Sequence, residues 1–231
     1  MITTESARVF VKAEEGSPPA GYEKASVRYY DKDGNVLIRF EGTKAWRCNN
    51  PGNMKHKNGG FAMRHGAIGK AMSMAVFPDL ATGQAAFIAR LKTNEFGILT
   101  IERFPEVWDY DNATSYRQML CKITKLPLEK RIKDLSPDEF ERFQKAIVQI
   151  EGWDEGWEEF YEKEYIAGVR KQGRLLVEYL IQGSDGQRWF SKDDAIALAE
   201  MGRLHVVVVH AKRGTYLRSE YHTKPLRDRV C

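Results

Sequence analysis

The sequence predicts an α+β protein, with an N-terminal β-hairpin, a mainly helical region and a small β-β-α-β-β region in that order. Two β-prone runs flank a turn-forming stretch within residues 1–45. Amphipathic helical patterns and long polar loops fill residues 46–160. Strand-like and helical patterns then alternate over residues 163–231. These three ranges are the expected arm and hairpin, central domain and accessory domain.

The hairpin is expected between two runs rich in β-branched and aromatic residues, Val27–Tyr30 and Val36–Phe40. The stretch Asp31–Asn35 joins them and has the composition of a turn. Its Asp and Asn spacing resembles the start of a calcium loop, but the glycine comes too early and no Glu stands at the closing position. We therefore expect a hairpin turn and no metal site.

Two helices of the central region are predicted from their first residues. Asp79 can accept a hydrogen bond as the N-cap of a helix whose apolar residues run to Leu91. Thr114 or Ser115 opens a second helix, whose apolar side includes Tyr116, Leu120 and Ile123.

The clearest helix of the chain is expected to begin at Ser136. Pro137 occupies the first helical position and Glu139 the place that a capping box requires. Gly152 ends the helix. Its apolar stripe consists of Phe140, Phe143, Ile147 and Ile150.

The accessory region alternates between two kinds of pattern. Strands and one helix are expected, in chain order, at 165–170, 175–181, 191–202 (the helix), 206–209 and 215–218. No internal repeat or low-complexity segment interrupts the chain.

Composition and charge exclude several classes of protein. The 231 residues are 42% hydrophobic, which is enough for a core and too much for a disordered chain. Lys and Arg number 36 against 32 Asp and Glu, so the chain is only mildly basic and a nucleic-acid partner is not expected. No run of 18 apolar residues could span a membrane, and the first residues lack a secretory signal. We therefore expect synthesis in the cytoplasm without a signal peptide.

The cysteines do not predict a cofactor. Cys48, Cys121 and Cys231 are odd in number and far apart, which fits neither a zinc site nor a disulfide framework. Reduced thiols are the expectation, and a bridge between Cys48 and Cys121 formed after export stays open. No metal and no cofactor are expected.

The most unusual segment is the loop around Asn49, Asn50 and Asn53. Three Asn, one Pro and one Gly stand within five residues, which excludes a helix or a central strand. Carboxamides offer paired donors and acceptors that suit the hydroxyl and N-acetyl groups of a glycan. The same side chains can instead satisfy the loop's own main chain. Both readings stay open.

This segment carries a resemblance to a known family. Residues 47–53 read Arg-Cys-Asn-Asn-Pro-Gly-Asn, and Gly60–Ala62, Arg64–Gly69 and Ala75–Pro78 follow in order. The chain from about residue 42 to 153 resembles the R-N-N-N-P-G-N lysozyme-like module of phage tail proteins and type VI secretion effectors. The resemblance implies a mainly helical lysozyme-like fold and a peptidoglycan glycoside hydrolase. Cys48 and the stretch Tyr110–Ala113 depart from the family's pattern.

The resemblance also implies partners and a place of action. An antibacterial effector of this kind is delivered by a secretion spike, with or without a chaperone, and acts on glycan strands in the periplasm of a target bacterium. Its producer would need an immunity protein. Residues 163–231 are similar to a small uncharacterised domain, for which a stabilising or docking role is expected.

The candidate catalytic acid is Glu151. Glycoside hydrolysis needs a carboxylic acid that keeps its proton near neutral pH, and apolar surroundings disfavour its charged form. Glu151 lies eleven residues after Phe140 and four after Ile147, on the same helical stripe. It is alternatively exposed at a frayed helix end or paired with Arg142. Glu41, which precedes the Asn-rich loop, is the rival acid.

Further residues are weaker candidates. Asp109 and Asp111 could act as a base or stabiliser, although one essential Glu can suffice. Trp46 and Trp108 could stack on a sugar ring or belong to the core, and Trp46 is kept as a site candidate because of its neighbours. His65 could bind substrate or satisfy a loop carbonyl.

Two other functions stay open at this point. The chain could be a non-catalytic wall-binding or docking module of a phage or secretion spike. A peptide amidase would need a pair such as Cys48 and His65. For the glycosidase, the sequence does not distinguish hydrolysis from lytic transglycosylation.

Overall fold

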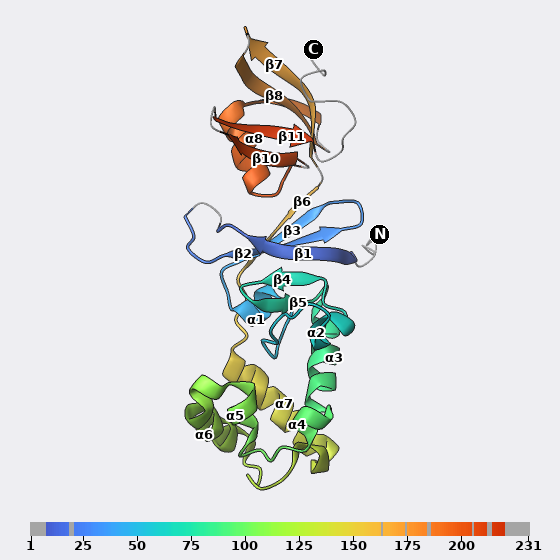
Figure 1. Ribbon diagram of the computed structural model, residues 1–231, viewed down its shortest axis with the longest axis vertical. Coiled ribbons are helices and arrows are strands. Elements are labelled where there is room, and N and C mark those ends of the chain that lie inside the picture. Colours follow the sequence, from blue (N-terminus) through green and yellow to red (C-terminus); the bar gives the residue numbers. More distant parts are fainter. Residues whose placement is uncertain are drawn as a thin grey trace, which may run out of the picture. The chain divides into compact units, whose positions relative to one another are not determined.

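The computed structural model divides into two compact units (Figure 1). One unit is Gly42–Gly156, and the other combines Met1–Glu41 with Trp157–Cys231. The first and third of the ranges expected from the sequence thus share one unit. The structure describes residues 8–18, 21–162, 164–173, 175–183, 186–204, 206–211 and 214–219.

In one unit, strands β1, β2, β3 and β6 form an antiparallel sheet in the order β1-β2-β3-β6. In the unit Gly42–Gly156, β4 and β5 form an antiparallel pair. The strands are β1 (Phe10–Gly16), β2 (Ser26–Asp31), β3 (Val36–Phe40), β4 (Gly69–Ala71), β5 (Met74–Val76) and β6 (Trp157–Tyr161).

The predicted hairpin turn is confirmed between β2 and β3. The Asp31 carboxylate accepts hydrogen bonds from the main-chain N–H groups of Asp33 and Asn35, each at 2.9 Å. It also accepts one from the side-chain amide of Asn35 at 2.8 Å. The acidic side chain is therefore used by the turn itself, as expected of an Asx-type turn.

The prediction of a mainly helical fold is wrong. Helices make up 35% and strands 33% of the residues that the structure describes. The hairpin is part of a larger sheet because β1 and β6 pair with its two sides. Both strands carry several exposed charged side chains, and β6 is an edge strand, where such residues are tolerated. The charged residues of β1 and β6 therefore hid the alternation of apolar and polar residues that predicts a strand. Strands β4 and β5 have only three residues each, too few to show that alternation.

The unit Gly42–Gly156 contains the helices on which the candidate site is built. Figure 1 shows α5, α6 and α7 close together. The α-helices are α1 (Lys44–Arg47), α2 (Phe61–Arg64), α3 (Leu80–Leu91), α4 (Asn94–Gly97), α5 (Phe104–Trp108), α6 (Ala113–Thr124) and α7 (Pro137–Glu151); short 3-10 turns are η1 (Tyr110–Asn112) and η2 (Ile132–Asp134). Their buried side chains include Phe87, Leu91, Ile101, Phe104, Leu120, Phe143 and Ile147.

The predicted caps of two helices are confirmed. Asp79 accepts a hydrogen bond from the Thr82 N–H at 2.7 Å and begins α3. Ser136 and Glu139 form the expected capping box at the start of α7. The helix expected from Thr114 or Ser115 begins slightly earlier, at Ala113.

Replacing Ser136 with alanine is expected to lower the free energy of unfolding by about 1 kcal/mol, because the N–H of Glu139 loses its acceptor. Chemical denaturation measures the change. Gln149→Ala, an exposed position of the same helix, is the matched control and should leave stability within about 0.5 kcal/mol. Equal stability of Ser136→Ala and wild type would show that the box contributes nothing.

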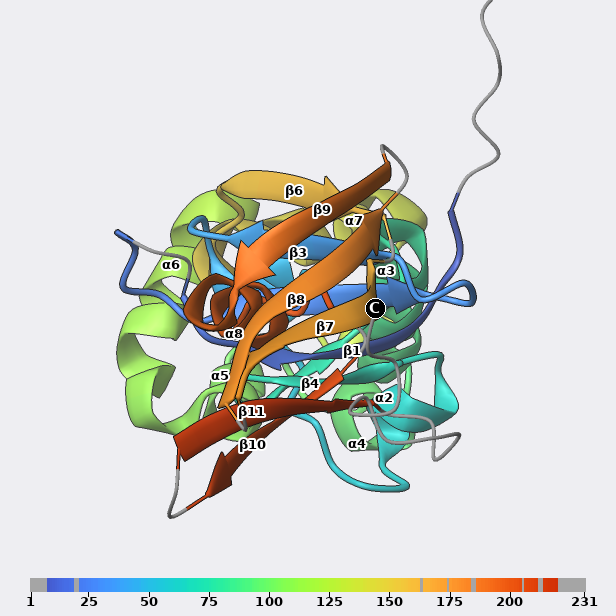
Figure 2. The same ribbon diagram turned by 90° about the horizontal axis from the view of Figure 1, so that it is seen from above.

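The accessory region has one strand more than the predicted β-β-α-β-β order. Its strands β7, β8 and β9 form an antiparallel sheet, seen side by side in Figure 2, and β10 pairs with β11. The sequence did not predict β9 because its side chains are mostly polar and exposed. The elements are β7 (Tyr165–Gln172), β8 (Leu175–Gly183), β9 (Gly186–Ser191), α8 (Lys192–Glu200), β10 (Val206–Ala211) and β11 (Gly214–Ser219).

Candidate functional site

The carboxylate of Glu151 is held by three hydrogen-bond donors from separate segments. Its Oε1 accepts from Trp108 Nε1 and from the Tyr116 hydroxyl, each at 2.9 Å. Its Oε2 accepts from Asn53 Nδ2 at 3.0 Å. We call Asn53, Trp108, Tyr116 and Glu151 the Glu151 cluster. Glu151 is the last residue of α7 and is half-buried, so it is neither frayed nor open to water on all sides.

Trp108 is oriented by aromatic packing. Its ring stacks on Phe104, with centroids 5.1 Å apart, and meets Phe87 and Phe96 edge-on. An indole N–H can only donate, and it needs an acceptor when its ring is packed into a core. The Glu151 carboxylate is that acceptor.

Tyr116 donates to Glu151 from the buried face of α6. Burial raises the pKa of the Tyr116 phenol far above its ordinary value. The negative charges of Glu151 and Asp109 raise it further, because they oppose a phenolate. The hydroxyl therefore keeps its proton and remains a donor throughout the usual pH range.

The Asn-rich loop uses two of its three carboxamides internally. Asn50 is fully buried; its Nδ2 donates to the carbonyls of Met54 and Ala75 at 2.9 Å, and its Oδ1 accepts from the Met54 N–H at 3.0 Å. Asn49 is also buried and donates to the Phe77 carbonyl at 3.1 Å. Both side chains therefore hold the main chain of the loop, which is one of the two readings that the sequence left open.

Asn53 is the member of the loop that reaches the candidate acid. The loop turns through left-handed conformations at Asn49 and Asn53, with φ of 50° and 45°, which asparagine tolerates. Helix α3 lies directly against it, because a Cβ on Gly83 would stand 1.8 Å from the Asn49 carbonyl oxygen. A Cβ on Gly52 would stand 2.5 Å from the ring of Phe87. These close approaches fix the loop and with it the side chain of Asn53.

Three other predicted residues lie elsewhere. Trp46 is only 5% exposed and belongs to the interior, so its ring offers no face to a sugar. His65 is exposed, stacks on Phe61 at 3.8 Å and places its Nδ1 2.8 Å from the Phe61 carbonyl oxygen. Glu41 belongs to the other unit and pairs with Lys24 at 3.2 Å.

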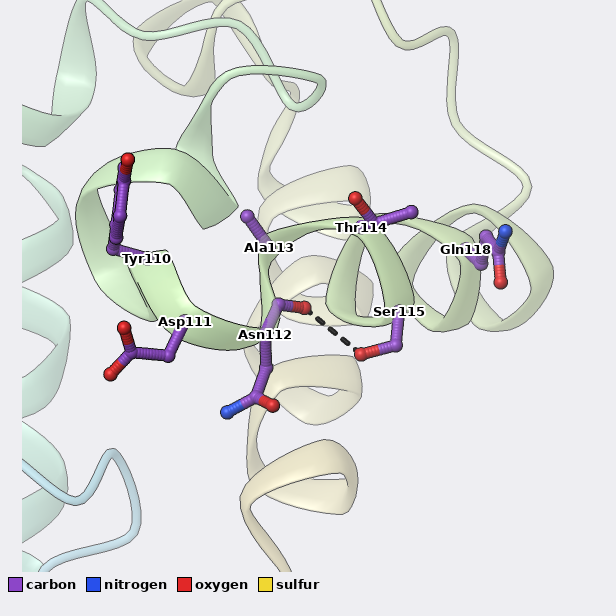
Figure 3. A pocket seen from close by; sticks show the side chains of 7 residues that line it. All are labelled: Tyr110, Asp111, Asn112, Ala113, Thr114, Ser115 and Gln118. Carbon is purple, nitrogen blue, oxygen red and sulfur yellow. Dashed lines mark hydrogen bonds between the residues drawn. The ribbon is translucent and has the colours of Figure 1, made fainter.

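Asp111 lines a shallow polar pocket of about 310 Å³ at the start of α6 (Figure 3). The pocket is on the exposed side of that helix, whereas Tyr116 faces inward. The neighbouring Asp109 accepts from the Asn112 side-chain amide at 3.1 Å and acts electrostatically on Tyr116. Asp109 is therefore the second carboxylate associated with the Glu151 cluster. The pocket is lined by Tyr110, Asp111, Asn112, Ala113, Thr114, Ser115 and Gln118.

The described residues offer no evident place for a metal or a thiol nucleophile. Within them, no group of three or more His, Cys, Asp or Glu side chains could hold a metal ion. Cys48 is fully buried while Cys121 is exposed, and the two are not joined by a disulfide. The thiol of Cys48 is therefore closed to a substrate, and the ring of His65 contacts Phe61.

The sequence singled out Glu151 but missed the partners of its carboxylate. Trp108 was weighed as a stacking residue or core residue, and Tyr116 as an apolar helix position. The available signal was that both side chains carry a polar group which needs a partner when buried. Sequence spacing cannot show that a partner lies 43 or 35 residues further along the chain.

A comparison with models of known protein families and with curated proteins finds no match to this chain. Within the described part of the chain, no helix is both long and apolar enough to cross a membrane.

Proposed function

We propose that the chain is an enzyme that cleaves the glycan strands of peptidoglycan, with Glu151 as its proton donor. The observation that carries the proposal is the half-buried Glu151 carboxylate, held by donors from three separate segments of one unit. A carboxyl group fixed in this way is typical of a site that must present one oxygen in a defined direction.

The proposed reaction begins with transfer of the carboxyl proton of Glu151 to the glycosidic oxygen. The C–O bond breaks, the leaving sugar departs as an alcohol, and positive charge develops on the remaining sugar. The oxygen of water, or of a hydroxyl on the same sugar, then bonds to the positively charged carbon and gives its proton to Glu151. Trp108 and Tyr116 stabilise the carboxylate that exists between these two steps, because both donate to it.

Asp109 is the proposed stabiliser of the developing positive charge. Its carboxylate is close enough to raise the pKa of Tyr116, whereas Asp111 lies in the exposed pocket. The sequence named both Asp109 and Asp111 for this role, and the proposal keeps Asp109 in place of Asp111. Asn49 and Asn50 support the loop without touching glycan.

The proposal also includes a setting. We place the enzyme among antibacterial effectors that a secretion spike delivers to the periplasm of a target cell. An immunity protein in the producer would cover the Glu151 cluster. Co-expression with neighbouring genes of the producer, followed by co-purification, tests for such a partner.

Digestion of purified sacculi tests the activity itself. Mass spectrometry of the released fragments should detect either new reducing ends, which indicate hydrolysis, or anhydro-sugar ends, which indicate lytic transglycosylation. Sedimentation with sacculi and no new ends would instead identify a wall-binding module. New free peptides without glycan cleavage would identify an amidase, and either result contradicts the proposal.

A further inference from the structure

The side-chain amide of Asn53 has a hydrogen-bonded nitrogen and an oxygen without a partner. Its Nδ2 donates to Glu151 Oε2 at 3.0 Å and lies 3.5 Å from the Glu151 carbonyl oxygen. Its Oδ1 is buried and accepts no hydrogen bond from any described residue. A buried amide oxygen without a donor is costly, so its presence beside a candidate acid needs an explanation.

The two donors on the other side of Glu151 favour one of its oxygens as the site of a proton. Oε1 faces the indole N–H of Trp108, which can only donate, and the hydroxyl of Tyr116. A carboxyl proton on Oε1 would cost a hydrogen bond from Trp108 or Tyr116, because both now donate to that oxygen. We infer that the protonated form carries its proton on Oε2, the oxygen that faces Asn53.

In the orientation seen, Asn53 suits only the carboxylate form of Glu151. A protonated Oε2 would meet the Nδ2–H₂ group, donor against donor. A half-turn of the carboxamide exchanges its oxygen and nitrogen with almost no change of shape. Asn53 Oδ1, which has no partner in the orientation seen, would then accept a hydrogen bond from the O–H of the carboxylic acid.

We propose that Asn53 is a positioning residue whose carboxamide reverses its orientation with the protonation state of Glu151, donating to the carboxylate and accepting from the acid. The inference rests on the proposed function, in which Glu151 both gives and recovers a proton. In either orientation one end of the Asn53 amide lacks a partner. The protonation state of Glu151 therefore decides which of the two orientations is favoured. The reacting oxygen of Glu151 is accordingly Oε2.

Three neighbouring groups could affect the pH dependence of the Glu151–Asn53 pair. From α6 comes Tyr116, which stays protonated because burial raises its pKa. From the end of α5 come the uncharged Trp108 and, next to it, the carboxylate of Asp109. Asp109 is unchanged in every variant. A difference between the Glu151 titration of wild type and that of a variant therefore reports the substitution at Asn53.

Two substitutions that tolerate the left-handed main chain at this position test the inference. Asn53→Asp places a second carboxylate opposite Oε2, where two acids must share one proton. Asn53→Gly removes both ends of the amide and keeps the main chain unstrained. The matched control is Asn58→Asp, which adds the same charge at an exposed position of the same unit.

Two readouts separate this inference from the proposed function. Carbon-13 NMR of the Glu151 carboxyl, assigned with Glu151→Gln, gives its titration midpoint without any substrate. Asn53→Asp should raise that midpoint by more than about one pH unit, and Asn58→Asp should leave it unchanged. On sacculi, Asn53→Asp should stay active to a correspondingly higher pH, because the acid keeps its proton longer. Asn53→Gly should lower kcat at least about tenfold with little change in KM.

Each outcome is decisive. A midpoint that is the same in Asn53→Asp and wild type overturns the inference, whatever the activity. So does an Asn53→Gly variant with wild-type kcat and pH profile. A shifted midpoint in a chain that does not cleave sacculi would support the pairing of Asn53 with both forms of Glu151 and refute the proposed function.

Discussion

Replacing Glu151 with glutamine is expected to abolish glycan cleavage, by at least about a thousandfold, while leaving the fold intact. The loss follows because a carboxamide cannot donate a proton to the glycosidic oxygen. The fold should survive because the glutamine oxygen can still accept from Trp108 and Tyr116. Its amide nitrogen can then donate to the Asn53 oxygen after a half-turn of that side chain. Release of soluble fragments from sacculi and the melting temperature measure the two effects.

Glu102→Gln is the matched control for this prediction, since Glu102 is an exposed glutamate of the same unit. It should retain full activity. Full activity of Glu151→Gln would contradict the assignment, and loss of activity in Glu41→Gln alone would transfer the acid's role to Glu41.

Replacing Gly83 with alanine is expected to lower the free energy of unfolding by about 2 kcal/mol or more. An alanine Cβ would lie 1.8 Å from the Asn49 carbonyl oxygen, so α3 and the Asn-rich loop would have to separate. Helix propensity alone predicts the opposite sign, a gain of about 1 kcal/mol, because Gly83 lies inside α3. Urea denaturation distinguishes the two. We also expect lower activity, since the loop carries Asn53 to Glu151.

Gly97→Ala provides the comparison for this experiment. Gly97 is a buried residue of α4, but a Cβ there would find its nearest neighbour at 3.7 Å, an ordinary contact. It should be tolerated or slightly stabilising. A stabilised Gly83→Ala protein would show that the loop does not pack closely on α3.

The helix that carries the candidate acid could be read from the sequence almost completely. Ser136 and Glu139 satisfy each other's main chain within one turn, and the apolar stripe needs only the period of the helix. Gly152 ends the helix immediately after Glu151. All of these are interactions over a few residues, so no knowledge of the remaining chain was required.

The Asn-rich loop could be predicted as a loop, but not the separate roles of its asparagines. Asn49 and Asn50 face inward and Asn53 faces Glu151, although all three stand within five residues. The difference depends on where α3 and β5 pass the loop. Composition does not contain that information.

The sequence by itself determined the hairpin of β2 and β3, the caps of α3 and α7 and the placing of a glutamate at the end of an apolar stripe. Only the tertiary structure decided that β1 and β6 enlarge the hairpin into a sheet, and that Trp108 and Tyr116 donate to Glu151. The reason is the range of the interactions. Caps, turns and periodic stripes act between near neighbours, whereas strand pairing and the partners of a buried carboxylate join residues far apart in the chain.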